Sequence, residues 1–274
     1  MKILIIIVLY NKKIEDLFIF KEALEEETDL FIYDNSPKAQ TVPIIHNAHI
    51  LYEHNKTNPG VSVAYNRGIK RAKELEKDTV LLLDHDTIFT MEYAKLYQIQ
   101  YMQYRDNYIY APIISDVDKN KIYSPALLTH FIGKAIPFNN FKFESIYNLS
   151  GKSVINSGLM IPLTIFEKIG GFNEKIKLDF SDIYFIEKYK ELNIDIILLD
   201  IYIEHSISGD EGKNYKAEMH RFKYYCNGAQ ELSKSLSQST FLTATRRMLR
   251  LVQKYYSIKP IHIYINYYLG NKKI

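Results

Sequence analysis

Two aspartates separated by one residue are the clearest candidates for chemistry in this chain. Asp84 and Asp86 flank His85, and the three residues directly follow a strand-like run of apolar residues. Carboxylate oxygens are the ligands that Mg²⁺ and Mn²⁺ prefer, and Mg²⁺ is commonly held by one or two carboxylates together with substrate phosphates. A solvated turn is the alternative for an isolated pair of this kind. The position at a strand end favours a site for a divalent cation and a diphosphate.

Further acidic residues are candidates for binding or catalysis. Asp34, in the sequence Asp34-Asn35-Ser36, ends another strand-like run, and a simple Asx turn is its alternative interpretation. Asp179 and Asp182 lie at the start of a predicted helix. They could stabilise the helix dipole, or one of them could be a general base that deprotonates a hydroxyl group. The spacing does not separate these two interpretations.

Two other features could contribute to a site. Glu204-His205 follows a predicted strand. An imidazole is a suitable third ligand for Mn²⁺, although a lone histidine is more often structural. The turn Asn58-Pro59-Gly60 precedes a predicted helix that contains Asn66 and Gly68. Glycine inside a helix costs about 1 kcal/mol relative to alanine, so we expect close packing or a ligand contact at Gly68.

Strands and helices alternate along the first half of the chain. We predict strands at 3–9, 30–33, 49–52, 79–83 and 108–114, and helices at 14–25, 62–76 and 91–104. Such alternation predicts a parallel sheet covered by helices. In these sheets, ligands bind beyond the carboxyl ends of the strands. The residues at those ends, Tyr10, Asn11, Asp34 and Asp84, should therefore share one site.

The second half has a less regular pattern. We predict a turn at 116–121, a loop over the site at 127–152, strands at 154–161, 195–199 and 201–204, and helices at 163–169 and 181–192. Gly170 and Gly171 are expected to end the first of these helices. From residue 216 onward the pattern is helical. We therefore predict an α/β domain with a mixed, mostly parallel sheet at residues 1–215 and a helical extension at residues 216–274.

The composition is that of an ordinary globular protein. The 274 residues include 47% hydrophobic and 24% charged side chains, and the formal net charge of +3 is too small to indicate nucleic-acid binding. The single cysteine, Cys226, excludes an intrachain disulfide and fits a reducing cytoplasm. The apolar run at 3–9 is too short for a membrane span, which needs roughly 20 residues, and no signal-peptide cleavage site follows it. We expect a cytoplasmic protein with no nucleic-acid partner.

The last part of the chain is basic and aromatic. Arg246, Arg250 and Lys254 recur every four residues and should lie along one face of a helix, with apolar residues beside them. A basic amphipathic helix suggests contact with an anionic membrane surface. The alternative is a helix packed on the main domain with a solvated basic face. The first interpretation predicts a peripheral protein at the cytoplasmic face of the inner membrane.

The order of these motifs resembles that of the family 2 inverting glycosyltransferases with the GT-A fold, particularly the rhamnosyltransferase-like branch. The resemblance extends over about three quarters of the chain, roughly from residue 3 to residue 209. The segments that carry it are Val8–Asn11, Tyr33–Ser36, Asn58–Gly68, Leu81–Thr87, Ser157–Met160, Ile169–Phe172, Asp179–Asp182 and Glu204-His205.

The resemblance implies a role for each candidate residue in donor and metal binding. Tyr10 and Asn11 would lie near the nucleotide, and Asp34 would bond the pyrimidine base or the ribose. Asn58 and Asn66 would line the nucleotide pocket. The remaining roles concern the diphosphate and its Mn²⁺ or Mg²⁺ ion: Asp84 would contact the ribose or the metal, His85 would lie at the donor, and Asp86 and His205 would ligate the metal.

The resemblance also implies a catalytic base just before or within the helix that begins near residue 181. The position along this helix favours Asp182, with Asp179 as the second candidate. The chain departs from the family here, because the usual pair is two adjacent carboxylates and Ser181 precedes Asp182. The family often has an arginine where Lys188 stands.

The implied activity is transfer of a sugar with inversion, from a nucleotide-diphosphate donor to a saccharide or a lipid-linked glycan. The branch suggests dTDP-rhamnose, with a UDP-hexose as the other possible donor, and a role in bacterial surface polysaccharide synthesis. Two alternatives stay open. One is a non-catalytic nucleotide-sugar-binding module. The other is a nucleotidyltransferase, although the residues after the first strand, Tyr10-Asn11-Lys12-Lys13, lack the glycine-rich loop of that class.

Overall fold

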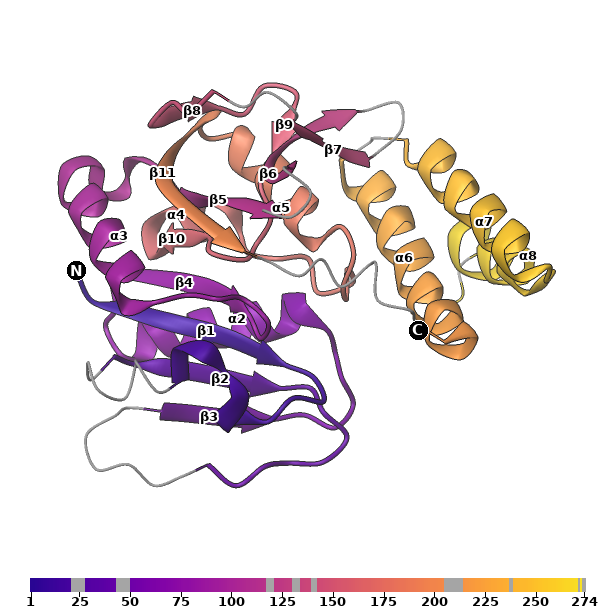
Figure 1. Cartoon of the computed structure of the whole chain (residues 1–274), viewed down its shortest axis with the longest axis horizontal. Coiled ribbons are helices and arrows are strands. Elements are labelled where there is room, and N and C mark those ends of the chain that lie inside the picture. The colour runs from indigo at the N-terminus through magenta and orange to yellow at the C-terminus, as the bar shows by residue number, and fades with distance from the viewer. Residues whose placement is uncertain are drawn as a thin grey trace.

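The computed structural model of the chain describes residues 1–20, 28–42, 50–116, 121–129, 134–138, 142–204, 214–236, 239–270 and 272. Within these residues, eleven strands form one mixed sheet with the order β3-β2-β1-β4-β10-β5-β11-β8 and three strands branching from β5. Helices flank the sheet, and a group of helices follows it at the C-terminal end (Figure 1).

The N-terminal half of the sheet is parallel, as the continuous apolar runs predict. Leu9 at the end of β1 pairs with Asp34 of β2, and Val8 of β1 pairs with Asp84 of β4. The carboxyl ends of these three strands therefore lie side by side. The strands of this half are β1 (Ile3–Leu9), β2 (Leu30–Asp34), β3 (Ile50–His54) and β4 (Thr79–Asp84).

The other half of the sheet is mixed. A short strand, β10, lies antiparallel between β4 and β5, whereas β11 runs parallel to β5. The predicted strand at 154–161 is thus reduced to β10, and the strands predicted at 195–199 and 201–204 form one strand, β11. The main strands here are β5 (Tyr110–Asp116), β8 (Ile146–Asn148), β10 (Met160–Pro162) and β11 (Asp195–Glu204).

The prediction of a loop at 127–152 is wrong. Described residues of this segment belong to antiparallel strands that extend the sheet from β5, since β6 pairs with β5, β7 and β9. Backbone groups that a loop would leave to solvent are thereby paired in ladders. The strands are β6 (Lys121–Thr129), β7 (Lys134–Phe138) and β9 (Lys152–Ser153), with β8 at the far edge of the sheet.

Helices cover both faces of the sheet because successive residues of the central strand point to opposite sides. Leu4, Ile6 and Val8 of β1 share one buried cluster with α2, α4 and α5, while Ile5 and Ile7 share the other with α3. The helical elements of this part are η1 (Ile14–Asp16), α2 (Val61–Glu74), α3 (Met91–Tyr104), η2 (Arg105–Asn107), α4 (Leu163–Ile169) and α5 (Ser181–Lys190).

The predicted helix at 14–25 is interrupted in the structure. Ile14–Asp16 forms a single 3₁₀ turn, and Leu17 then takes an extended conformation with φ of −72° and ψ of 127°. Residues 18–20 are helical again, and the rest of the prediction lies outside the described residues. The spacing of apolar residues did not reveal this break, because Ile14 in the 3₁₀ turn and Leu17 at the break are both buried, as they would be on one face of a continuous helix.

Close packing explains the glycine inside α2. A Cβ atom at Gly68 would lie only 2.6 Å from the Cδ1 atom of Ile6 in β1. A side chain at this position would require the Ile6 side chain or α2 to shift, and overpacking of this kind costs about 1–3 kcal/mol. Of the two explanations expected from the sequence, the structure therefore supports close packing.

A third core forms where the C-terminal helices meet the segment before α5. Phe222 and Cys226 of α6 pack with Met248 of α7, and the same cluster contains Ile176 and Phe180. The described residues contain no helix that is long and apolar enough to cross a membrane. The helical elements are α6 (Tyr215–Leu236), α7 (Phe241–Tyr255), α8 (Lys259–Tyr264) and the π-helical turn η3 (Ile265–Leu269).

Candidate functional site

The turns that follow β1, β2 and β4 are tied to one another at one edge of the sheet. The backbone N–H of Asn11 donates to Ser36 Oγ at 2.8 Å, and the ring of His85 lies 3.3 Å from the carbonyl oxygen of Val8. Lys12 Nζ reaches the carbonyl oxygen of His85 at 2.7 Å. The structure thus brings together the polar residues that the sequence places at these three strand ends.

Asp34 is the last residue of β2 at this edge, and it is completely buried. Its carboxylate accepts hydrogen bonds from the Ser36 N–H and the Tyr52 hydroxyl, both at 2.8 Å, and from Gln40 Nε2 at 3.1 Å. Burial opposes ionisation, but the bonds from Ser36, Tyr52 and Gln40 outweigh it and lower the pKa of Asp34. Asp34 is therefore an ionised anchor for the loop that contains Ser36 and Gln40.

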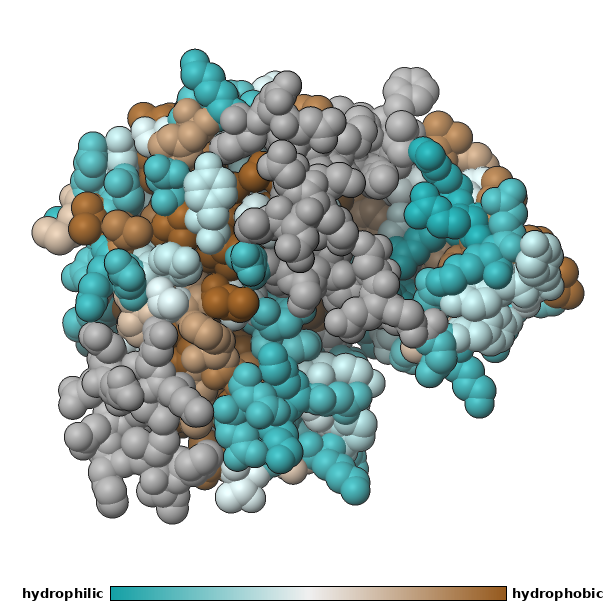
Figure 2. Space-filling model, in the orientation of Figure 1, coloured by the Kyte–Doolittle hydropathy of each residue, from teal (hydrophilic) through white to brown (hydrophobic). Residues whose placement is uncertain are grey.

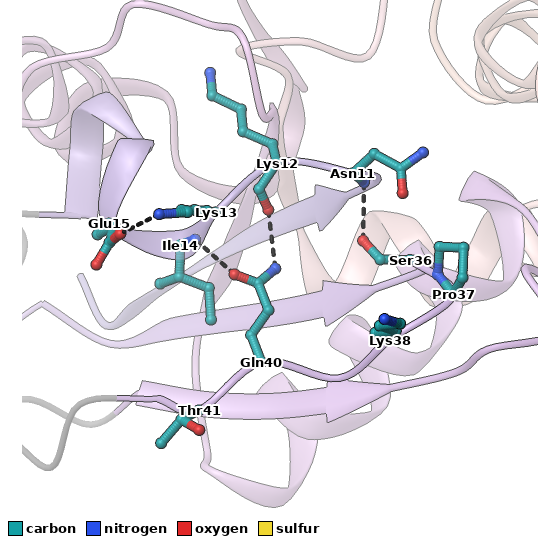
Figure 3. A pocket seen from close by; sticks show the side chains of 10 residues that line it. All are labelled: Asn11, Lys12, Lys13, Ile14, Glu15, Ser36, Pro37, Lys38, Gln40 and Thr41. Carbon is teal, nitrogen blue, oxygen red and sulfur yellow. Dashed lines mark hydrogen bonds and ion pairs between the residues drawn. The ribbon is translucent and has the colours of Figure 1, made fainter.

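A cavity of 640 Å³ opens above this network (Figure 3). Gln40 bridges its two sides, since Nε2 donates to the Lys12 carbonyl at 2.9 Å and Oε1 accepts from the Ile14 N–H at 3.1 Å. The cavity is lined by the turn after β1 and the loop after β2, and three lysines contribute to it: Lys12, Lys13 and Lys38. Glu15 also lines the cavity and pairs with Lys13 at 3.1 Å, so the three lysines leave the lining with a net positive charge. Its size and this charge suit an anionic small molecule.

Tyr65 of α2 lies beside Asp84 and within electrostatic reach of two further carboxylates. Its side chain is buried, and its hydroxyl lies 3.4 Å from Asp84 Oδ1. Burial raises the pKa of Tyr65 well above its ordinary value, and the negative charges of Asp84, Asp182 and Asp86 raise it further. Asp182 lies about 100 residues from the other two in sequence. Tyr65 was not singled out from the sequence, where it reads only as an apolar-face residue of the helix.

Asp182 has the properties expected of a general base. It is partly buried in the first turn of α5, and its Oδ1 accepts the Ile183 N–H at 2.8 Å. Burial raises the pKa of Asp182 to about 6, Asp179 and Asp84 add to the rise, and the backbone N–H bonds partly oppose it. A carboxylate with a pKa near the working pH is well matched to accept a proton.

Asp179 has a different environment. Its Oδ1 lies 3.3 Å from Arg221 of α6 and 3.7 Å from Arg247 of α7, and the Arg247 guanidinium stacks over Tyr225 at 4.0 Å. Two arginines compensate the charge of this carboxylate. Asp179 thus connects the C-terminal helices to the segment before α5, and it is less suited than Asp182 to accept a proton.

Backbone strain precedes Asp182. Phe180 has a φ of 77°, in the left-handed region that bulky side chains avoid. Its ring packs against Tyr225 at 4.8 Å, and the Cβ of a side chain at Gly228 would meet the carbonyl oxygen of Asp179 at 2.5 Å. Close packing with α6 therefore holds the strained turn that presents Asp182, and such strain is concentrated at functional sites.

The N-terminal end of α2 is docked on the same segment. Gly60 has a φ of 104°, and the Val61 N–H donates to the Lys177 carbonyl at 2.8 Å. Ser62 Oγ donates to the Ile176 carbonyl at 2.6 Å and lies 3.0 Å from Ser181 Oγ. These contacts fix the helix that carries Tyr65 relative to the start of α5.

The two asparagines expected in the nucleotide pocket have different positions. Asn58 is partly exposed in the turn before α2, with a φ of 47°. Asn66 instead clamps the loop after α4, because its amide donates to the Phe172 carbonyl and accepts the Phe172 N–H, both at 3.0 Å. The bonds of Asn66 indicate a role in holding that loop.

Tyr10 directly follows β1 and lies in the exposed part of the candidate site. Its side chain is 47% exposed. Burial raises the pKa of Tyr224 in α6, and a smaller electrostatic effect of Tyr10 raises it further. In Figure 1 the arrowheads of β1 to β3 point toward the side of the molecule on which α6 stands. The C-terminal helices therefore border the site.

A divalent cation fits the donor chemistry of Asp84 and Asp86. Asp84 ends β4 and Asp86 lies in the turn after it, so both offer carboxylate oxygens, the ligands that Mg²⁺ and Mn²⁺ prefer. No group of three or more His, Cys, Asp or Glu side chains that could hold a metal occurs in the part of the chain that the structure describes. His205, the predicted further ligand, lies outside that part.

Comparison with known protein families and sequences gives a consistent result. The family described as Glycosyl transferase family 2 matches residues 4–163, which include β1, β2, β4 and the residues Asp84 and Asp86. The dTDP-rhamnosyl transferase RfbF of Shigella flexneri is 25% identical over 221 residues, which cover 75% of this chain and 69% of that protein.

Solved structures share the fold at low sequence identity. S. aureus TarS 1-349 is similar with a TM-score of 0.59 and 14% identity, covering 93% of this chain and 72% of that one. The mannosyltransferase PcManGT from Pyrobaculum calidifontis, in complex with GDP-Man and Mn²⁺, has a TM-score of 0.55 and 10% identity and covers 96% of this chain and 78% of that one. The predicted GT-A fold, with a mostly parallel sheet, flanking helices and a C-terminal helical region, is confirmed.

Proposed function

Because the chain belongs to glycosyl transferase family 2 and is a glycosyltransferase, we propose that it transfers a sugar from a nucleoside diphosphate bound at the edge formed by β1, β2 and β4. The observation that carries this proposal is that the carboxyl ends of β1, β2 and β4 lie side by side, with Asp84 at the end of β4 only 3.4 Å from the Tyr65 hydroxyl, whose pKa is also raised by the charges of Asp182 and Asp86. Asp84 and Asp86 are suited to the diphosphate side of a donor. Asp182 is suited to take the proton from an acceptor hydroxyl.

The proposed donor is dTDP-rhamnose. Support comes from the similarity to the Shigella flexneri dTDP-rhamnosyl transferase. A UDP-hexose is the second candidate, because a structure of S. aureus TarS 1-349 in complex with UDP-GlcNAc shares the fold. The nucleotide would occupy the cavity beside Tyr10 and Asn11. Asp34 is completely buried, so its proposed role is to hold Ser36 and Gln40 at the cavity wall.

Asp84 and Asp86 are the residues that would hold Mn²⁺ or Mg²⁺. Such a cation, when bound, offsets the charge that develops on a departing diphosphate. His85 and Lys12 keep the turn after β4 joined to the turn after β1. The role of His205 as a further ligand remains a prediction.

Asp182 is the proposed base, and Asp179 is proposed as an anchor for Arg221 and Arg247. Asp182 would take the proton from an acceptor hydroxyl. The oxygen of that hydroxyl would form a bond to the anomeric carbon on the face opposite the diphosphate, while the bond from that carbon to the diphosphate oxygen breaks. This geometry inverts the anomeric configuration.

The proposed acceptor is a saccharide or a lipid-linked glycan in bacterial surface polysaccharide synthesis. Residues 1–215 would form the catalytic domain and residues 216–274 a helical extension that borders the acceptor side. The anchoring of Asp179 by Arg221 of α6 and Arg247 of α7 supports this arrangement.

A panel of nucleotide sugars tests the proposed function. We expect dTDP-rhamnose, with Mn²⁺ or Mg²⁺, to give the largest thermal stabilisation and the fastest release of nucleoside diphosphate, with UDP-hexoses second and GDP-mannose without effect. Each donor is assayed with and without a chelator as the matched control. Absence of both stabilisation and turnover with every pyrimidine donor would contradict the proposal.

A further inference from the structure

The helices after α6 carry charge of one sign. The segment from residue 239 to residue 270 contains no aspartate or glutamate. Its cations are Arg246, Arg247, Arg250, Lys254 and Lys259. The net charge of the whole chain is only +3, so this part is far more basic than the remainder. Such a segment attracts polyanionic surfaces.

Two sides of α7 are fixed by contacts within the molecule. Ala244, Met248 and Leu251 are buried in the third core. Arg247 reaches Asp179, and Lys254 pairs with Glu218 of α6 at 2.7 Å. These contacts explain how α7 packs on the rest of the protein. They also determine which side of the helix faces the solvent.

The outer face of α7 combines apolar and basic side chains. Leu242 and Leu249 are 51% and 52% exposed, and Arg246 and Arg250 are exposed beside them. Spacings of three, four and seven residues place all four on one side of the helix. The turn that follows exposes Tyr256 and Ile258, at 96% and 67%. We call these six residues the α7 surface; Figure 2 shows hydrophobic and hydrophilic residues together at this end of the molecule.

We propose that the α7 surface binds the surface of an anionic phospholipid bilayer. The apolar side chains would insert at the boundary of headgroups and acyl chains, and Arg246 and Arg250 would pair with lipid phosphates. A solvated basic face accounts for the arginines alone and leaves the exposed Leu242, Leu249 and Ile258 without a role.

Other occupants fit the α7 surface less well. A nucleic acid would use the arginines but offers no apolar counterpart to the leucines. A second copy of the chain in a symmetric contact would oppose the same patches and bring like charges together. The six residues of the α7 surface do not include Arg247, which reaches Asp179, and binding of a bilayer there does not depend on the identity of the donor.

Vesicle co-sedimentation of the full chain tests this proposal. We expect binding to vesicles that contain phosphatidylglycerol and much weaker binding to vesicles of phosphatidylcholine alone. The double variant Arg246→Glu with Arg250→Glu should reduce partitioning to the anionic vesicles by more than about tenfold. Leu242→Ser with Leu249→Ser should also reduce it, and this loss should persist at low salt.

Matched variants control for charge and exposure. Lys70→Glu with Lys168→Glu makes the same charge change on exposed positions of α2 and α4, and Ile99→Ser with Met102→Ser removes two side chains of α3 that are each 60% exposed. These variants should bind as the unaltered chain does, and all variants should keep its thermal unfolding. Equal binding to neutral vesicles, equal binding by the α7 variants, or a dimer in gel filtration that the leucine variant abolishes would overturn the proposal.

Discussion

Asp182→Asn is expected to lower the rate of sugar transfer by about 10²–10⁴-fold and to leave donor binding intact. The amide has nearly the same shape as the carboxylate, but it cannot accept the proton of an attacking hydroxyl. The measurement is single-turnover transfer at saturating donor, together with the donor dissociation constant from calorimetry. A fall in transfer without a fall in donor affinity separates a base from a residue that only maintains the fold.

The pH dependence gives a second readout for Asp182. Burial raises the pKa of this carboxylate to about 6, and the charges of Asp179 and Asp84 add to the rise. Because the base must be ionised, kcat/KM should rise as pH increases through about 6. Asp182→Asn should lose this limb of the profile. A rate that is independent of pH across this range in the unaltered chain would argue against Asp182.

The stability of the same variant has a predictable sign. The pKa of Asp182 is raised above its ordinary value of 3.8, so protonation favours the folded state. That contribution is complete below the unfolded pKa and is lost as pH rises through about 6. Above that pH the ionised carboxylate costs roughly 1–3 kcal/mol, and Asp182→Asn should unfold at a higher temperature than the unaltered chain.

Asp179→Asn is the matched control for the base. It removes the charge that pairs with Arg221 and Arg247, so we expect lower stability of the C-terminal helices and largely retained transfer. If Asp179→Asn abolishes transfer and Asp182→Asn does not, the two roles are exchanged and our account of the arginine contacts is wrong.

Asp86→Ala should reduce metal-dependent donor binding and turnover by at least about 100-fold. Asp86 is partly buried in the turn after β4 and belongs to none of the hydrophobic clusters, so the fold should survive. Calorimetric titration of the donor with and without Mn²⁺ measures the effect. Asp200→Ala, at an exposed carboxylate of β11, serves as the control and should be neutral. Unchanged Mn²⁺ dependence in Asp86→Ala would remove this residue from the mechanism.

The sequence predicts the N-terminal half of the sheet well because each strand there is a continuous apolar run that ends in polar residues. Ile3–Leu9 and Thr79–Asp84 show this pattern most clearly. The same reasoning fails at 127–152, where the strands are short and their pairing partners are distant in sequence. β6 takes its register from β5, β7 and β9, and no local period signals those contacts.

The sequence could identify candidate residues whose roles depend on residue type and on position at a strand end, as for Asp84 and Asp86. Contacts between distant elements were not predictable. Tyr65 comes within electrostatic reach of Asp182 only when α2 docks on the segment before α5. The pairing of Asp179 with Arg247 depends on a helix about 70 residues further along the chain. Spacing alone did not separate a helix-dipole role from a general base for Asp179 and Asp182, whereas the structure gives the two residues different surroundings.

The most direct test of the account is a crystal structure of the chain with dTDP and Mn²⁺, with the metal located by anomalous scattering. We predict one manganese peak bonded to Asp86 and to oxygens of the diphosphate, with the thymidine in the cavity beside Asn11 and Ser36 and Asp182 facing the open side. A manganese ion bound elsewhere, or a nucleotide whose diphosphate lies far from Asp84 and Asp86, would contradict the account.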